Sequence, residues 1–438
     1  MFIIYPLFLS HLQSTNPFRH ILLENMNILP RELVGEISNS LHVNDAIELG
    51  KTNKQFFTNL SKTDFGYKVN HLVDIDTIFD VKRDYKRRQY VLGNLKHIRI
   101  SNSNQLTYLQ TNELALTRLT FDDVFNEPVD NLELLSVLPL SHLTFGFDFN
   151  QSMENFKFPR SLTHLTFGHR FNQPVDKIAL PQSLTHLTFG NRFDQSVDNL
   201  ELPESLTHLT FGVYFNQSID NLKLPISLTH LAFGYKFNQP VYNLTLHHQL
   251  SLTHLIFGAT FNKLVDHLKL PVSLTHLTFG HCFNQSVDNL ELPDSLAHLT
   301  FGYDFNKSVD KLRLPKSLTH LTFGVYFDQS VDNLKLPVSL THLTFKYQFN
   351  RSIDKLILPQ SLTHLMLSLH FNQPIDNIIL PQSLTHLTFG FYFNQSIDKL
   401  KLPQSLKSLT LGTNYNQSIE YLAILPQSHP NLIIIRRK

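Results

Sequence analysis

Apolar residues recur along most of this chain in one fixed frame, Leu-x-x-Leu-x-Phe, followed four residues later by a second aromatic residue. In one clear copy the frame falls on Leu206, Leu209, Phe211 and Phe215. The second aromatic occurs fourteen times at intervals of 22 residues, two of them lengthened to 24, at Phe125, Phe149, Phe171, Phe193, Phe215, Phe237, Phe261, Phe283, Phe305, Phe327, Phe349, Phe371, Phe393 and Tyr415. Such a period is typical of a solenoid, in which each repeat contacts mainly its neighbours.

Each repeat is expected to contribute one short strand. Apolar and polar residues alternate so that Leu209 and Phe211 point inward and His208 and Thr210 outward, and Gly212 ends the strand. Further inward side chains are expected at Phe215, Ile219, Leu222 and Leu224, before the coil closes at Pro225. One repeat cannot fold alone, so the repeats must stack and their strands pair about 4.8 Å apart. The predicted fold is a repeat solenoid of 22-residue coils with a parallel β-sheet on one face.

The pattern divides the chain into four parts. Degenerate copies of the frame start at Leu95 and Leu116, and Leu432 and Ile434 continue it near the other end. Before the array, apolar residues at helical spacing predict a small α-helical domain. We therefore expect a poorly defined N-terminal extension (1–25), a three-helix motif (26–60), a linker or capping subdomain (61–94) and the solenoid (95–438).

Three resemblances follow from these residues. The frame resembles leucine-rich repeats, and the sequence Phe-Asn-Gln-Pro-Val-Asp from Phe171, with its close copy from Phe371, resembles FNIP repeats. Ser replaces the motif's Pro in most copies, as at Ser196 and Ser218, which leaves the local turn geometry open. The N-terminal pattern Leu29-Pro30, Leu33, Ile37 and Leu41, followed by Asp45, Leu49 and Phe56, resembles an F-box. The combination resembles the F-box and FNIP-repeat proteins of giant DNA viruses that infect amoebae. A plain helical cap on the first repeat is the alternative reading of residues 26–60.

Composition limits the binding partners and the cellular compartment that we expect. Lys plus Arg (37) nearly balances Asp plus Glu (36), so no overall charge favours nucleic acid or a membrane as partner. The single cysteine, Cys282, permits no disulfide within these residues, which suits a reducing compartment. The apolar start is too short to span a bilayer and has no basic residues before it. We expect a cytoplasmic protein, in the host cytoplasm if the chain is viral.

One slot holds histidine in twelve repeats, at His142, His164, His186, His208, His230, His254, His276, His298, His320, His342, His364 and His386. A straight column does not offer three or four ligands that converge on zinc. A structural column of neutral stacked imidazoles is the preferred reading, with ligand contact as the alternative, and stability should then fall as the pH drops through about 6. Asn residues such as Asn216 are expected to cap backbone groups in the turn rather than carry glycans. The Ser, His and Asp of each repeat form no distinct triad, so no catalytic, cofactor or metal site is expected.

The two residues after the Gly slot vary between repeats and supply an aromatic and basic stripe, a composition typical of protein interfaces. An unconstrained surface loop is the alternative. The target-binding candidates are Arg170, Arg192, Tyr214, Tyr235, Lys236, Tyr303, Tyr326 and Tyr392.

We therefore expect an interaction protein and not an enzyme. The F-box resemblance implies that Leu29, Pro30, Leu33, Ile37 and Leu41 dock on the Skp-family adaptor of a cullin-RING ubiquitin ligase. The repeats would hold a target protein for ubiquitin transfer, with the chain acting as a monomer within the larger complex. The alternatives are a repeat scaffold with no ubiquitin link and a secreted adhesin.

Overall fold

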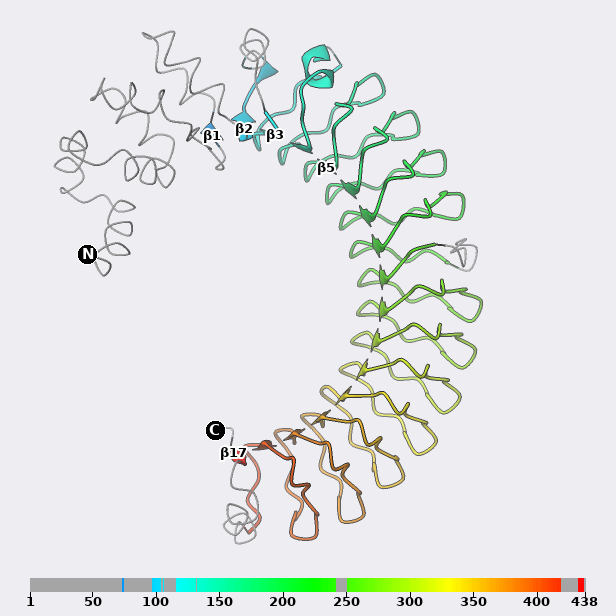
Figure 1. Cartoon of the computed structure of the whole chain (residues 1–438), viewed down its shortest axis with the longest axis vertical. Coiled ribbons are helices and arrows are strands. Elements are labelled where there is room, and N and C mark those ends of the chain that lie inside the picture. Colours follow the sequence, from blue (N-terminus) through cyan, green and yellow to red (C-terminus); the bar gives the residue numbers. More distant parts are fainter. Residues whose placement is uncertain are drawn as a thin grey trace, which may run out of the picture. The chain divides into compact units, whose positions relative to one another are not determined.

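The computed structural model describes residues 73–74, 97–103, 105, 116–130, 132–241, 250–418 and 432–436. They form short parallel strands joined by extended segments and tight turns (Figure 1). The chain divides into two compact units, one of residues 1–171 and 179–184, the other of residues 172–178 and 185–438. Each unit is described separately below as unit 1 and unit 2. No helix in the described part is long and apolar enough to cross a membrane.

Unit 1 contains the first strands of the array. They are β1 (Val73–Asp74), β2 (His97–Ile100), β3 (Arg118–Phe121), β4 (His142–Thr144) and β5 (His164–Thr166), with a short 3-10 helix, η2, at Glu133–Ser136. Each strand pairs in parallel with the next. The copies predicted to start at Leu95 and Leu116 therefore do form strands. Strand pairing also reaches β1, inside the segment that the sequence assigned to a linker or capping subdomain.

Unit 2 contains the remaining strands. They are β6 (His186–Thr188), β7 (His208–Thr210), β8 (His230–Ala232), β9 (His254–Ile256), β10 (His276–Thr278), β11 (His298–Thr300), β12 (His320–Thr322), β13 (His342–Thr344), β14 (His364–Met366), β15 (His386–Thr388), β16 (Ser408–Leu411) and β17 (Ile433–Arg436). The register is exact from coil to coil, since His208 lies opposite His230 and Leu209 opposite Leu231. The last strand places Ile434 opposite Leu409, so the array continues to β17 as predicted.

The core of each coil is formed by the residues that the alternation predicts. Leu206, Leu209, Phe211 and Phe215 are all buried, with at most 2% of their surface exposed. The prediction was wrong at Leu224, which is only half-buried, whereas the following Pro225 is buried. The coil turns at the Leu-Pro step, so the proline ring fills the interior position that the sequence pattern assigned to the leucine.

The ring spacings show that unit 2 curves with its strands on the inner side (Figure 1). The histidine rings, on the side of the strands that faces away from the core, lie 4.1–4.3 Å apart between successive strands. The Phe rings that end the strands lie 5.1–6.0 Å apart. The second Phe rings, farther from the strands, lie 5.9–6.2 Å apart. Coils that are closest at the strand face and spread behind it must curve around that face.

Polar side chains join each coil to the one before it. The Oδ1 atom of Asn216 accepts a hydrogen bond from the backbone N of Asn238 at 2.8 Å, and Gln239 Nε2 donates to the Asn216 carbonyl at 2.7 Å. Asp194 fills the same slot and accepts from the backbone N of Asn216 at 2.9 Å. These contacts confirm that the Asn column caps backbone donors in the turns.

The structure also explains how Ser replaces Pro in the motif. Ser218 Oγ accepts a hydrogen bond from the backbone N of Asp220 at 3.2 Å, and Ser196 and Ser330 do the same for Asp198 and Asp332. A Ser side chain thereby stabilises the turn through a local hydrogen bond, where Pro would restrict its φ angle directly.

Candidate functional site

The strand face, defined as the outward His and Thr positions of the strands, carries the predicted histidine column. In unit 2 the column runs without a gap from His186 to His386, with neighbouring ring planes within 18° of parallel. In unit 1, His142 and His164 stack at 4.1 Å. The rings are closer than the strand spacing of about 4.8 Å because they lie on the inner side of the curve.

In most coils a threonine before the histidine determines which ring nitrogen holds the proton, whereas Ala297 precedes His298 and Ser141 precedes His142. Thr207 Oγ1 lies 2.8 Å from His208 Nδ1, and it donates to the carbonyl of Thr185 at 3.0 Å. A hydroxyl has only one hydrogen, so Thr207 must accept its second bond from an Nδ1–H group. The Nε2 atom then lacks a proton, and its lone pair is directed away from the backbone. The arrangement recurs at Thr229, Thr253, Thr275, Thr319, Thr341, Thr363 and Thr385.

Burial favours the neutral form of seven column histidines in unit 2, and repulsion between neighbouring rings adds to this in most of them. Desolvation lowers the pKa of His320 to about 4, with further contributions from charge on His298 and His342. Desolvation is also the largest cause that lowers the pKa of His186, His230, His276, His298, His342 and His364. At neutral pH these seven histidines therefore offer uncharged hydrogen-bond acceptors on the strand face. Within the described residues, no three His, Cys, Asp or Glu side chains are arranged to hold a metal ion.

The variable pairs of residues that follow the Gly slot lie together in a second column, which we call the turn stripe. In unit 2 it comprises residues 191–192, 213–214, 235–236, 259–260, 281–282, 303–304, 325–326, 347–348, 369–370, 391–392 and 413–414. Backbone hydrogen bonds hold it, since Tyr214 N donates to the Asn191 carbonyl at 2.8 Å and Lys236 N donates to the Val213 carbonyl at 2.8 Å. The backbone of the stripe is therefore constrained by the stack, while its side chains remain free to differ.

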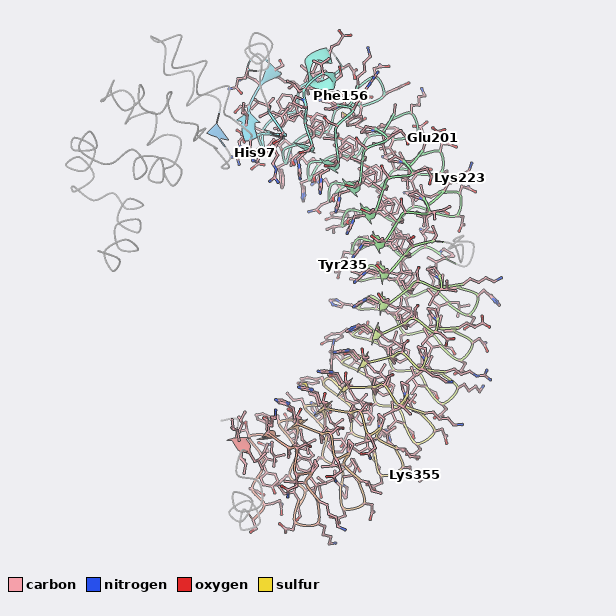
Figure 2. The ribbon with its side chains drawn as sticks, viewed as in Figure 1. His97, Phe156, Glu201, Lys223, Tyr235 and Lys355 are labelled. Atoms are coloured by element: carbon pink, nitrogen blue, oxygen red, sulfur yellow. The ribbon has the colours of Figure 1, made fainter. Side chains whose placement is uncertain are left out.

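The predicted target-binding candidates occupy this stripe. Tyr214, Tyr235, Tyr303, Tyr326 and Tyr392 are each exposed over at least 40% of their surface. Figure 2 shows Tyr235 on the strand side of unit 2, with Glu201 and Lys223 on the opposite side.

Several of these candidates contact one another within their own unit. The rings of Tyr303 and Tyr326 meet edge to face at 5.1 Å, and Lys236 Nζ lies 5.5 Å from the Tyr235 ring centroid. Arg192 is exposed in unit 2. In unit 1, Arg170 forms an ion pair with Asp148 at 3.1 Å. The adaptor-binding candidates Leu29, Pro30, Leu33, Ile37 and Leu41 lie outside the described residues.

The structure adds one feature that the sequence pattern did not reveal. A cavity of about 320 Å³ opens where the stripe meets the strand face, and its walls include Tyr347, Met366, Leu369 and Phe391. None of these four was among the candidates. The available signal was a departure from the repeat: Lys346 and Ser368 occupy the Gly slot in consecutive coils, and Met366 replaces the usual Thr.

These features define the class of protein: a solenoid of parallel strands, similar to leucine-rich repeats, with a polar strand face beside an aromatic stripe. The chain matches the FNIP Repeat family over residues 149–192, 193–236, 215–246, 250–282, 283–326, 305–348, 327–370, 349–392 and 393–436. It belongs to that family, as the repeated motif indicated.

One solved structure has the same kind of fold. The crystal structure of CroV588, described as a novel circular LRR protein structure, is 43% identical with a TM-score of 0.62, covering 78% of this chain. This chain spans only 53% of that protein. An internalin (inlF) from Listeria monocytogenes is 15% identical, with a TM-score of 0.43, and the match covers 83% of this chain and 94% of the internalin. No curated protein matches the sequence.

Proposed function

We propose that this protein binds a target polypeptide along the turn stripe and the adjoining strand face. The observation that carries the proposal is the contrast within each coil. Backbone hydrogen bonds constrain the stripe, yet its side chains vary and in unit 2 include six exposed tyrosines, the five candidates and Tyr347. Rigid, amphipathic tyrosine side chains lose little entropy on binding and are frequent in interface hot spots. Binding, and not catalysis, is the activity that such a surface supports.

A cross-linking experiment in cells tests this proposal. A photoreactive phenylalanine analogue placed at Tyr235 should form covalent adducts with a discrete partner, which mass spectrometry identifies. The same analogue at Lys223, on the opposite side of unit 2 (Figure 2), is the matched control. Both positions are exposed, so both substitutions should be tolerated. Equal adducts from the two positions, or none from Tyr235, would contradict the proposal.

The more specific form of the proposal is that the chain recruits this target to a cullin-RING ubiquitin ligase. It is supported by the F-box resemblance of residues 26–60, in which Leu29, Pro30, Leu33, Ile37 and Leu41 would contact a Skp-family adaptor. The full chain would then act as one subunit of a cytoplasmic complex, with no direct role for nucleic acid or membrane. The near balance of basic and acidic residues is consistent with that setting.

Adaptor binding can be measured with purified components. The full chain should retain a purified Skp-family adaptor in a pull-down, and the double substitution Leu29→Asp with Pro30→Ala should abolish retention. A Tyr235→Ser variant, changed only in the stripe, should retain the adaptor as the unmodified chain does. Failure of the unmodified chain to retain it would favour a repeat scaffold without a ubiquitin link.

A further inference from the structure

The cavity beside β14 arises where two consecutive coils break the glycine rule of the array. At eight Gly slots of unit 2, from Gly212 to Gly412, a Cβ atom would lie 1.7–2.0 Å from the carbonyl oxygen of the preceding coil. The described glycines do not have positive φ angles, so contact between coils, and not backbone conformation, requires glycine there. Lys346 and Ser368 carry a side chain at this slot, so the chain around them must follow a different path.

The local structure changes accordingly. Residues 347–348 form a bend where other coils form a turn. Lys346 also receives a hydrogen bond at its carbonyl from the backbone N of Leu369, at 3.1 Å. Ser368 is fully buried, and its Oγ donates to the Phe349 carbonyl at 2.5 Å. Lys346 is therefore accommodated by an altered turn, whereas Ser368 is accommodated by the hydrogen bond of its buried hydroxyl and is followed by a regular turn at 369–370.

The side chains around this break also differ from those of the regular coils. Leu367 replaces the Phe that ends the strand in most coils, and Met366 replaces Thr on the strand face. The resulting cavity of about 320 Å³ is bordered by Met366, Tyr347 and Phe391, which are 42%, 44% and 39% exposed. A volume of this size lies at the lower end of the range for ligand pockets, about 300–1,000 Å³. It suits one bulky side chain better than an extended ligand.

The charges around the cavity are of one sign. From Val325 to Asn414 we consider the strands, the residue before each strand, the Gly slots and the turn stripe. Lys346 and Lys407 are the charged residues among these positions, and no carboxylate is present. Asp328, which follows the stripe residues 325–326 in the chain, is paired with Arg351 at 3.0 Å. The rim therefore favours an acidic partner.

We propose that this cavity anchors a bulky apolar side chain, such as Phe, from an acidic segment of a partner polypeptide. The proposal rests on the proposed function, because it assigns the part of the binding surface where the partner would be held most tightly. An apolar anchor in a pocket, surrounded by complementary charge, is the usual composition of an interface hot spot.

Met366 provides a direct reporter. The chain has four methionines, and Met153 is fully buried, whereas Met366 lies at the cavity. We expect the ¹³C-methyl signal of Met366 in the full chain to shift saturably with N-acetyl-Asp-Phe-Asp-amide. Affinity should be at least fivefold weaker for the Asp-Ala-Asp and Lys-Phe-Lys peptides. A Lys346→Glu variant should reverse the preference between the acidic and basic Phe peptides.

The Ile256→Met variant is the matched control. Ile256 occupies the same strand position as Met366 and is 45% exposed, but Gly258 keeps the regular turn in its coil. The methyl group introduced there should not respond to any peptide. The proposal is overturned if the Met366 signal does not move, if the Ala peptide shifts it equally, if Lys346→Glu leaves the preference unchanged, or if the control methyl responds alike. Cross-linking at Tyr235 is a separate measurement, so a negative result at the cavity would leave the stripe proposal standing.

Discussion

Acidification should destabilise unit 2 through the histidine column. Because the folded-state pKa of His320 is lowered to about 4, the unfolded chain binds more protons between about pH 6.5 and pH 4. Stability is therefore complete above pH 6.5 and is lost as the pH falls through this window.

The size of the effect can be worked from His320. A pKa lowered from about 6.5 to about 4 corresponds to about 3.4 kcal/mol between the fully neutral and fully protonated states. The side chain is half-exposed, so solvent screening reduces this by about half. Between pH 7.5 and pH 5.0, the lowered pKa of His320 alone should then reduce the free energy of unfolding by about 1 kcal/mol. The other column histidines with lowered pKa values add to the loss in the same direction.

Urea unfolding followed by far-ultraviolet circular dichroism measures this dependence. The double variant His298→Gln with His342→Gln removes both neighbours of His320 in the stack, so the pKa of His320 should rise and the loss of stability at pH 5.0 should shrink. The His281→Gln variant, altered in the stripe and outside the column, is the control. Equal unfolding free energies at pH 7.5 and 5.0, or an unchanged pH dependence in the double variant, would refute the reasoning.

Three further predictions concern the stability of the stack, each measured by urea unfolding at pH 7.5. Gly302→Ala should lower the free energy of unfolding by about 3 kcal/mol, because its Cβ would lie 1.7 Å from the carbonyl oxygen of the preceding coil. Lys346→Ala, at the same slot, should leave the free energy of unfolding nearly unchanged, and equal losses in the two variants would contradict the packing argument. Ala297→Thr should raise the free energy of unfolding by about 1 kcal/mol, since it gives His298 Nδ1 the hydroxyl partner that most column histidines have. A loss of stability would contradict the role assigned to the Thr–His hydrogen bonds. Phe305→Ala should lower the free energy of unfolding by about 3–5 kcal/mol, because this fully buried ring contacts rings in its own coil and in both neighbouring coils. A loss below 1 kcal/mol would contradict that burial.

Periodicity alone predicted most of the fold. A 22-residue repeat with one Leu-x-Phe alternation admits a single arrangement in which every coil buries the same residues, so strand position, inward faces and the His column followed directly. Leu224 was predicted to be buried but is only half-buried, because the pattern does not indicate where the chain bends around Pro225. Ring stacking at 4.1 Å and the His tautomer also required coordinates, since both depend on curvature and on a hydroxyl contributed by the adjacent residue.

The candidate site was predicted less completely. Variation after the Gly slot was sufficient to locate the stripe, because a position that tolerates many residue types must lie outside the core. The cavity at Met366 could not be predicted in this way, since it arises from what two altered Gly slots do to the neighbouring turn.

The sequence by itself thus determined the repeat, the register and the membership in the FNIP family, because these depend on local patterns that recur unchanged. Tertiary structure alone decided how closely the coils approach, which direction unit 2 curves, and where a break in the repeat leaves open space. Those properties depend on contacts between residues 22 positions apart, and only the stacked chain brings these together.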